Sequence, residues 1–260
     1  QQYGDATLAG FYSQGNYVRV LERRMAGARD RSQFGTQSSG TSEVGFARKE
    51  LAHALFLDNP ERASTVDATD SIDENRTTVW LDGLGLAGKQ QGSDGVPSFK
   101  YQMAGAILGI DHAFTDQFLA GFSSGFNYVD IDPGNSGGDG DIYAINASLY
   151  GTWFGEHAYV EGALSYAWQR FKNHRKVRIG GVEQTMSSKH DGNLFGAELG
   201  AGYRFLFNRF GVQPFARFSY LMLDEEGFEE EGATAVRLRV DGRTTNSLIS
   251  EIGIRFERAI

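Results

Sequence analysis

The sequence predicts an all-β protein, an antiparallel β-barrel that crosses an outer membrane, and two observations support this. From residue 77 onward, apolar side chains recur at every second position in runs of about ten residues, long enough for a tilted strand to cross a bilayer. The connections between these runs are alternately short and long, as in barrels with tight turns on one side and longer loops on the other. Eight such runs are visible, an even number, as bacterial barrels require.

The composition agrees with a sheet protein and excludes several other classes. The chain has 260 residues with 34 glycines, four prolines and no cysteine, so disulfide frameworks and thiolate sites are absent. No run of about 18 apolar residues occurs, which excludes a transmembrane helix. A net charge of -8 disfavours nucleic acid as a partner. The first residues lack the basic and then apolar start of a signal peptide, so we expect a piece of a longer chain.

Three regions follow one another along the chain. Residues 1–30 include a predicted amphipathic helix over 8–30, in which apolar residues at helical spacing alternate with arginines. Leu21, Arg23, Arg24, Met25 and Arg29 lie within this helix. Residues 31–76 are predicted to be a polar linker with a short helix over 46–57. Residues 77–260 contain the strands.

The strands have two chemically different faces. One face carries aromatic and aliphatic residues, and the other carries small residues with isolated charges. The alternation is clearest over residues 118–128, 143–153, 160–169, 195–205 and 248–256. Because the apolar face of a barrel meets lipid, the charged positions are predicted to face the lumen. These positions are Glu161, Glu198, Arg204, Arg217, Glu251 and Arg255.

The connections also differ in length and composition. Short turns are predicted around 115–116, 155–157 and 208–211, each beside aromatic residues that would form a girdle at the membrane interface. Long connections are predicted at 88–98, 132–140, 173–192 and 224–232. A soluble sandwich could show the same alternation, but its strands average about five or six residues.

Residues 77–260 resemble the β-domain of autotransporters, the type V secretion family. The resemblance rests on strand motifs and their spacing, at residues 79–85, 105–111, 212–220 (VQPFARFSY), 227–230 (GFEE), 236–241 (VRLRVD) and 248–255 (LISEIGIR). The resemblance implies an outer-membrane translocator that carries an N-terminal passenger to the cell surface. Family barrels have twelve strands, so the eight visible here imply that the last four strands are missing.

The resemblance also reinterprets the N-terminal helix. By itself, an amphipathic helix most simply packs on a surface. Residues 21–30 (LERRMAGARD) resemble the helix that threads the pore in the serine-protease autotransporters. A helix in the lumen is therefore expected, with its arginines paired to acidic residues of the wall. The Asn-Asn pair at which some members cut themselves is replaced here by Arg19 and Val20, so no self-cleavage is expected.

No motif indicates catalysis, a cofactor or a metal. The five histidines lie far apart without metal-ligand spacing, and neither a nucleophile elbow nor a phosphate-binding loop is present. The glycine-rich run 134–140 lacks the spaced acids of a calcium loop. The sequence is therefore expected not to encode an enzyme.

The leading functional hypothesis is the translocator, located in the outer membrane. Its expected partners are outer-membrane lipid and lipopolysaccharide, the barrel-assembly machinery and a covalently linked passenger. Two alternatives stay open at this point. One is a small complete barrel that acts as a structural protein or adhesin through its loops. The other is a barrel enzyme with a site at the outer rim, although no converging constellation of catalytic residues supports it.

Overall fold

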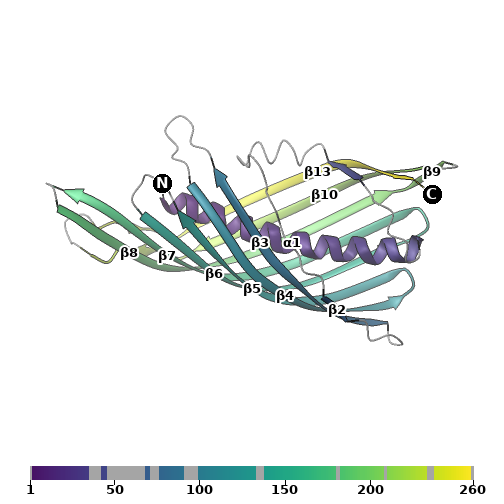
Figure 1. Ribbon diagram of the computed structural model, residues 1–260, viewed down its shortest axis with the longest axis horizontal. Helices are drawn as coiled ribbons and strands as arrows, with labels where there is room; N and C mark the ends of the chain where they lie inside the picture. The colour runs from purple at the N-terminus through teal and green to yellow at the C-terminus, as the bar shows by residue number, and fades with distance from the viewer. Residues whose placement is uncertain are drawn as a thin grey trace.

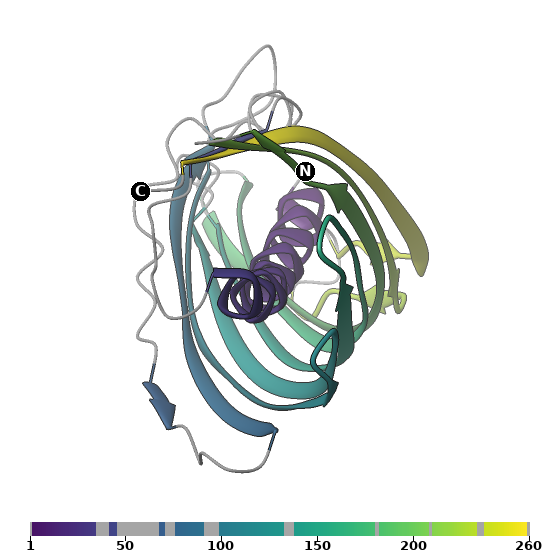
Figure 2. The ribbon, with the colours of Figure 1, turned by 90° about the vertical axis from the view of Figure 1, so that its right-hand side faces the viewer.

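The computed structural model describes residues 2–34, 42–45, 68–70, 76–90, 99–132, 138–179, 182–207, 210–232 and 237–258. Within these residues one long helix lies along the inside of a strongly curved antiparallel sheet (Figures 1 and 2). The predicted all-β class with an N-terminal helix is confirmed.

Helix α1 (Gln2–Phe34) is longer than the predicted range 8–30 at both ends. It contains no proline, which allows one uninterrupted helix. At about 1.5 Å per residue its 33 residues span about 50 Å. No helix in the described part of the chain is long and apolar enough to span a membrane.

Eight long strands form most of the sheet, in agreement with the prediction. They are β3 (Thr77–Gln90), β4 (Phe99–Thr115), β5 (Phe118–Asp132), β6 (Gly138–Phe154), β7 (Ala158–Ile179), β8 (Val182–Tyr203), β10 (Phe210–Glu225) and β13 (Arg243–Arg258). Five short strands accompany them: β1 (Ser42–Gly45), β2 (Ala68–Asp70), β9 (Phe205–Phe207), β11 (Phe228–Glu229) and β12 (Arg239–Val240).

The long strands pair with their neighbours in chain order, so the sheet is a meander. Its order is β1-β13-β10-β8-β7-β6-β5-β4-β3-β2, with β9 paired to β10. The sheet curls around α1 but is not closed, since β3 and β13 are not paired with each other among the described strands. Short strands from the predicted linker lie at both edges: β1 pairs with β13, and β2 pairs with β3. The predicted linker helix 46–57 lies outside the described residues.

The two faces of the sheet match the predicted alternation. On the outer face large apolar side chains are exposed, for example Leu164 at 63%, Leu199 at 58% and Leu248 at 73%. The inner face is buried around α1 and carries small, polar and charged residues together with apolar residues. The described part of the chain leaves these apolar side chains uncovered. Contact with bilayer hydrocarbon would stabilise such a surface.

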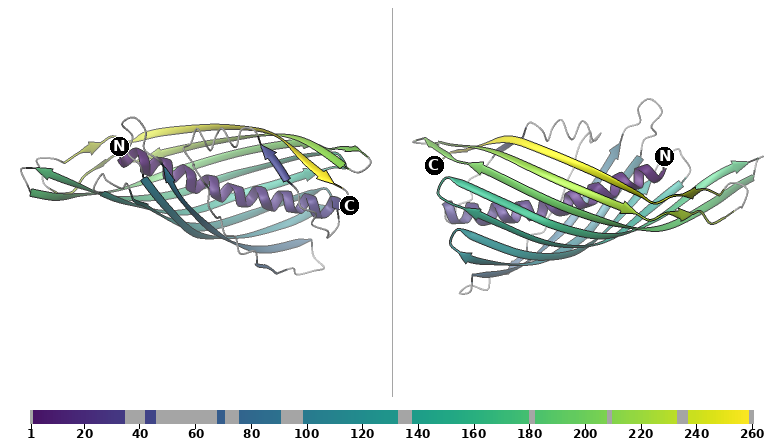
Figure 3. Two further views of the ribbon diagram at one scale, coloured as in Figure 1. Left: turned by 45° about the horizontal axis from the view of Figure 1, so that its top comes forward. Right: turned by 180° about the vertical axis from the view of Figure 1, so that it is seen from behind.

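The connections define two ends of the sheet. A turn of two residues links β4 to β5 and one of three residues links β6 to β7, and the single residue Arg204 separates β8 from β9 at the same end, which we call the inner end. The opposite end is called the outer end. There the expected long loop 173–192 is wrong, because β7 and β8 continue through it as a hairpin paired from Ala158↔Tyr203 to Ile179↔Val182. This hairpin projects beyond the other strands (Figure 3).

Candidate functional site

The candidate site is the interior of the curled sheet, which α1 fills. Apolar residues of the helix are buried among apolar residues of the inner face, and Tyr17, Leu21 and Met25 are fully covered. Gly10 lies so close to β7 that a Cβ there would stand 2.7 Å from the Gln169 side-chain oxygen. Close packing along its length therefore places the helix against the wall.

Arg217 on β10 is the centre of a buried charge cluster near the inner end. Its Nη2 lies 2.8 Å from Glu161 Oε1, and its Nη1 lies 3.2 Å from Glu251 Oε2. Nε of Arg217 stands 3.1 Å from Glu198 Oε1, a contact that is electrostatic only, because it lacks hydrogen-bond geometry. Nη1 also reaches Glu22 of α1 at 3.3 Å. One guanidinium on β10 thus contacts carboxylates of three other strands, β7, β8 and β13, and of the helix.

Arg29 brings a second helix charge into the same cluster. Its Nη1 donates to Glu161 Oε2 at 3.0 Å, and both side chains are 1% exposed. The guanidinium also lies over the Tyr159 ring, 3.7 Å from the centroid. Glu161 is therefore shared between the helix and Arg217, and either arginine alone would leave it only partly compensated.

Two further arginines of α1 meet aspartates on the wall. Arg24 makes two hydrogen bonds to Asp111, at 2.6 and 3.2 Å, and Asp111 also accepts a hydrogen bond from the Tyr150 hydroxyl at 3.1 Å. Arg23 lies 3.5 Å from Asp82, but its side chain is 51% exposed, so this ion pair is screened. All three predicted helix arginines thus face carboxylates of the sheet.

The outer half of α1 uses uncharged groups. The Tyr17 hydroxyl is 2.9 Å from the Ser123 hydroxyl. Asn127 Nδ2 donates to Ser13 Oγ at 2.6 Å, and Gln169 Nε2 donates to the Gly10 carbonyl at 3.2 Å. These hydrogen bonds between uncharged groups hold this part of the helix without an ion pair.

At the outer end the first turns of α1 meet Glu225, the last residue of β10. The Thr7 hydroxyl donates to Glu225 at 2.9 Å, and Arg243 Nε donates to the same carboxylate at 2.8 Å. Glu225 thus joins the outer end of the helix to Arg243 of β13.

The structure places all six wall residues of the sequence prediction on the inner face, each less than 10% exposed. Arg217, Glu161, Glu198 and Glu251 come together, as described above. Arg255 donates to Gln213 at 3.3 Å, and Arg204 is buried at the inner end.

Sequence reasoning missed Glu22 on the helix and Asp82 and Asp111 on the wall. The alternation of β4 could have found Asp111, since it shares the inner face with Ile107. Its pairing with Arg24 could not be found, because no local pattern joins residues 87 positions apart. Among the described residues, no group of three or more His, Asp, Glu or Cys could hold a metal.

Comparison with known proteins agrees with this architecture. Residues 79–260 match the family model of the autotransporter β-domain. The chain is 25% identical over 235 residues to the extracellular serine protease of Serratia marcescens, which covers 88% of this chain but 22% of that protein. It is 23% identical over 246 residues to outer membrane protein B of Rickettsia japonica, with 88% of this chain and 15% of that protein covered.

A solved structure shows the same fold. The translocator domain of the autotransporter NalP from Neisseria meningitidis superposes with a TM-score of 0.61 at 13% identity, which covers 93% of this chain and 70% of that one. The present chain spans 22% and 15% of the length of these two curated relatives.

Proposed function

Because the chain belongs to the autotransporter β-domain family, we propose that it is the translocator that anchors an N-terminal passenger and exports it to the cell surface. The outer membrane is the location that this family and the outer-membrane relatives indicate. The observation that carries the proposal is the helix enclosed by the sheet and joined to it by buried ion pairs.

The dimensions of α1 support this role. A helix of about 50 Å exceeds the ~30 Å thickness of bilayer hydrocarbon, so it can connect the two sides of the membrane. Its first turns reach Glu225 at the outer end, and its last turns reach Glu161 at the inner end. A passenger joined upstream of Gln2 would therefore emerge at the end with the long connections, which faces outward in outer-membrane barrels.

The charge pairs explain how a polar helix remains inside the sheet. Ionisable groups within a membrane protein persist where they face the interior and pair with one another. Arg24 and Arg29 each meet a carboxylate of the wall, and Glu22 meets Arg217. We propose that these residues seat the helix in the pore after export, and that the chain has no catalytic role of its own.

The proposal extends to partners. Insertion of such a barrel needs assembly, for which the barrel-assembly machinery is the proposed partner, and the exposed apolar outer face needs lipid. The passenger is the third partner, attached covalently upstream of α1. Its activity is not encoded in these residues.

Epitope accessibility in intact cells tests the direction of export. A tag inserted in the full-length protein just upstream of Gln2 is expected to bind antibody on intact cells. The matched control carries the same tag in the inner-end turn between β6 and β7, residues 155–157, and is expected to bind only after the outer membrane is opened. The reverse pattern, or equal binding at both sites, contradicts the proposal.

A further inference from the structure

Two lysines face each other on the outer surface of the sheet. Lys172 of β7 and Lys189 of β8 are directly opposite in register. Both lie on the outer face, on the part of the hairpin just beyond the apolar band. Like charges directly opposite on neighbouring strands destabilise a sheet. Among the described residues neither ammonium forms an ion pair with a carboxylate, although Asp141 of β6 is opposite Lys172 in register on its other side. No direct contact with a described carboxylate therefore occupies the two ammonium groups.

Neighbouring aromatic rings indicate the depth of these charges in the membrane. Lys172 Nζ lies 4.7 Å from the centroid of the Tyr143 ring, and the Arg170 guanidinium lies 4.8 Å from that of Trp168. Outward-facing Tyr and Trp gather where lipid headgroups begin. The cations therefore stand at headgroup depth on the lipid-facing side, provided that the sheet spans the membrane as proposed above.

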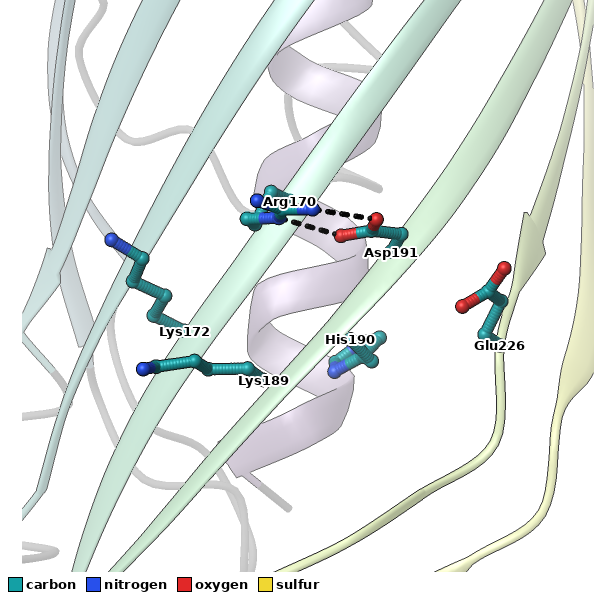
Figure 4. Close-up of a pocket in the computed structure, with 6 residues that line it drawn as sticks. All are labelled: Arg170, Lys172, Lys189, His190, Asp191 and Glu226. Atoms are coloured by element: carbon teal, nitrogen blue, oxygen red, sulfur yellow. Dashed lines mark hydrogen bonds and ion pairs between the residues drawn. The ribbon is translucent and has the colours of Figure 1, made fainter.

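The neighbouring groups shape an open cavity of about 500 Å³, lined by Arg170, Lys172, Lys189, His190, Asp191 and Glu226. Arg170 donates two hydrogen bonds to Asp191, at 2.8 and 2.9 Å. This ion pair fixes the position of the Asp191 carboxylate beside the cavity. In Figure 4 the two lysine side chains extend in the same direction from neighbouring strands, away from Glu226. Asp191 and Glu226 thus lie to one side of the two lysines, whereas the Lys172 ammonium points toward β6, where Asp141 is opposite Lys172 in register.

We propose that Lys172 and Lys189, with Arg170 beside them, bind the phosphate-bearing headgroup of a lipid in the outer leaflet. A phosphate can accept charge-assisted hydrogen bonds from both ammonium groups at once, which removes their mutual repulsion. The acyl chains of the same lipid would lie on the exposed apolar face below, which includes Tyr166 and Phe195. This inference rests on the membrane-spanning arrangement of the proposed function and identifies a specific lipid contact for it.

Lipid carried through purification tests the site. The full-length protein is extracted in mild detergent, and bound lipopolysaccharide is counted by native mass spectrometry. For the variant Lys172→Gln with Lys189→Gln we expect at least tenfold weaker retention, since the charge-assisted hydrogen bonds from both ammonium groups to the phosphate are lost. Lys172→Arg with Lys189→Arg is expected to retain the lipid, because it keeps the charges.

A second lysine pair provides a matched control. Lys89 of β3 and Lys100 of β4 are also opposite in register and exposed on the outer face. Lys89→Gln with Lys100→Gln removes the same charge, and we expect less than threefold loss of lipid. Equal losses from the two double variants would reduce the effect to general surface charge and overturn the proposed site.

Further measurements distinguish a lipid phosphate from a free phosphate ion as the ligand. They also distinguish failure of the lipid site from failure of the proposed function. Enzymatic removal of the lipid phosphates should abolish the difference between wild type and Lys172→Gln with Lys189→Gln, whereas an unchanged difference contradicts phosphate recognition. Millimolar inorganic phosphate should not displace the lipid; displacement would indicate an ion site instead. A variant that loses lipid yet still displays the upstream tag on intact cells leaves the translocator proposal standing.

Discussion

Along the inner third of α1 the helix meets the sheet through charged groups, whereas its outer half offers hydroxyls and a backbone carbonyl. Glu22, Arg24 and Arg29 each contact an oppositely charged residue of the wall. Ser13 and Tyr17 meet only neutral partners among the contacts described above. The helix is thus held by ion pairs in its inner third and by uncharged groups between Gly10 and Tyr17, while at its first turns the Thr7 hydroxyl donates to the Glu225 carboxylate.

The difference has an energetic consequence. Removing one member of a buried ion pair leaves the other charge uncompensated, which destabilises by about 3–5 kcal/mol. Removing one neutral hydrogen bond changes stability by about 1 kcal/mol. The inner end therefore determines whether the helix stays in the pore, while the outer half can be released in small steps. A pulling force from a passenger at the outer end would act first on the half of the helix that is held less strongly.

Reversing charge on the helix should produce the largest effect. Arg23→Glu, Arg24→Glu and Arg29→Glu together place three carboxylates opposite Asp82, Asp111 and Glu161. We expect the helix to leave the lumen, seen as raised pore conductance in planar bilayers and a lower thermal unfolding midpoint. Unchanged conductance and unchanged stability would show that α1 does not plug the pore.

Its matched control reverses the same number of arginines outside the lumen. Arg76, Arg237 and Arg239 all lie at exposed positions. Replacing these three with glutamate should leave conductance near the wild-type value, because exposed ion pairs contribute about 0–1 kcal/mol. A conductance change as large as that of the helix variant would mean that the net charge of the protein, and not the position of the helix, determines the conductance.

The wall side of the cluster gives the next largest effect. Arg217→Ala leaves Glu161, Glu198 and Glu251 without their shared cation. We expect the free energy of unfolding of the full-length protein to fall by about 3–5 kcal/mol in urea titrations in detergent. Arg170→Ala removes an arginine with two hydrogen bonds to a carboxylate on the outer face and should change it by less than about 1 kcal/mol. Similar losses for both would mean that burial of the cluster carries no energetic weight.

How far the sequence predicts the fold depends on which solvent each face meets. Where one face meets lipid and the other the lumen, alternate residues differ in hydropathy, which predicts Leu164 on the outer face and Glu161 on the inner face. Leu164 is exposed and Glu161 is buried. Beyond the apolar band the alternation in hydropathy disappears, since polar residues such as Lys172 and Asn173 follow one another, although Lys172 lies on the outer face and Asn173 is buried on the inner face. The β7–β8 hairpin was therefore predicted as a loop although its strands continue.

For the helix, prediction from the sequence is limited for a different reason. Its arginines would suit a solvent-exposed face as well as a charged lumen, so the residues alone favoured a surface helix, and only the family resemblance placed it in the pore. Pairings such as Arg29 with Glu161 join residues 132 positions apart and depend on how the strands curl. Residue spacing carries no information about that curvature, so the charge types could be predicted but not their partners.

The smallest effect is expected at the neutral outer half, and it tests the comparison most directly. Tyr17→Phe keeps the buried ring and removes only the hydroxyl that contacts Ser123. We expect a loss of about 1 kcal/mol in the free energy of unfolding, with no change in conductance, because the ion pairs below still hold the helix. Tyr166→Phe removes a hydroxyl that donates to Asn193 on the exposed outer face and should have almost no effect. A Tyr17→Phe loss as large as that of Arg217→Ala would mean that the outer half holds the helix as firmly as the charged end.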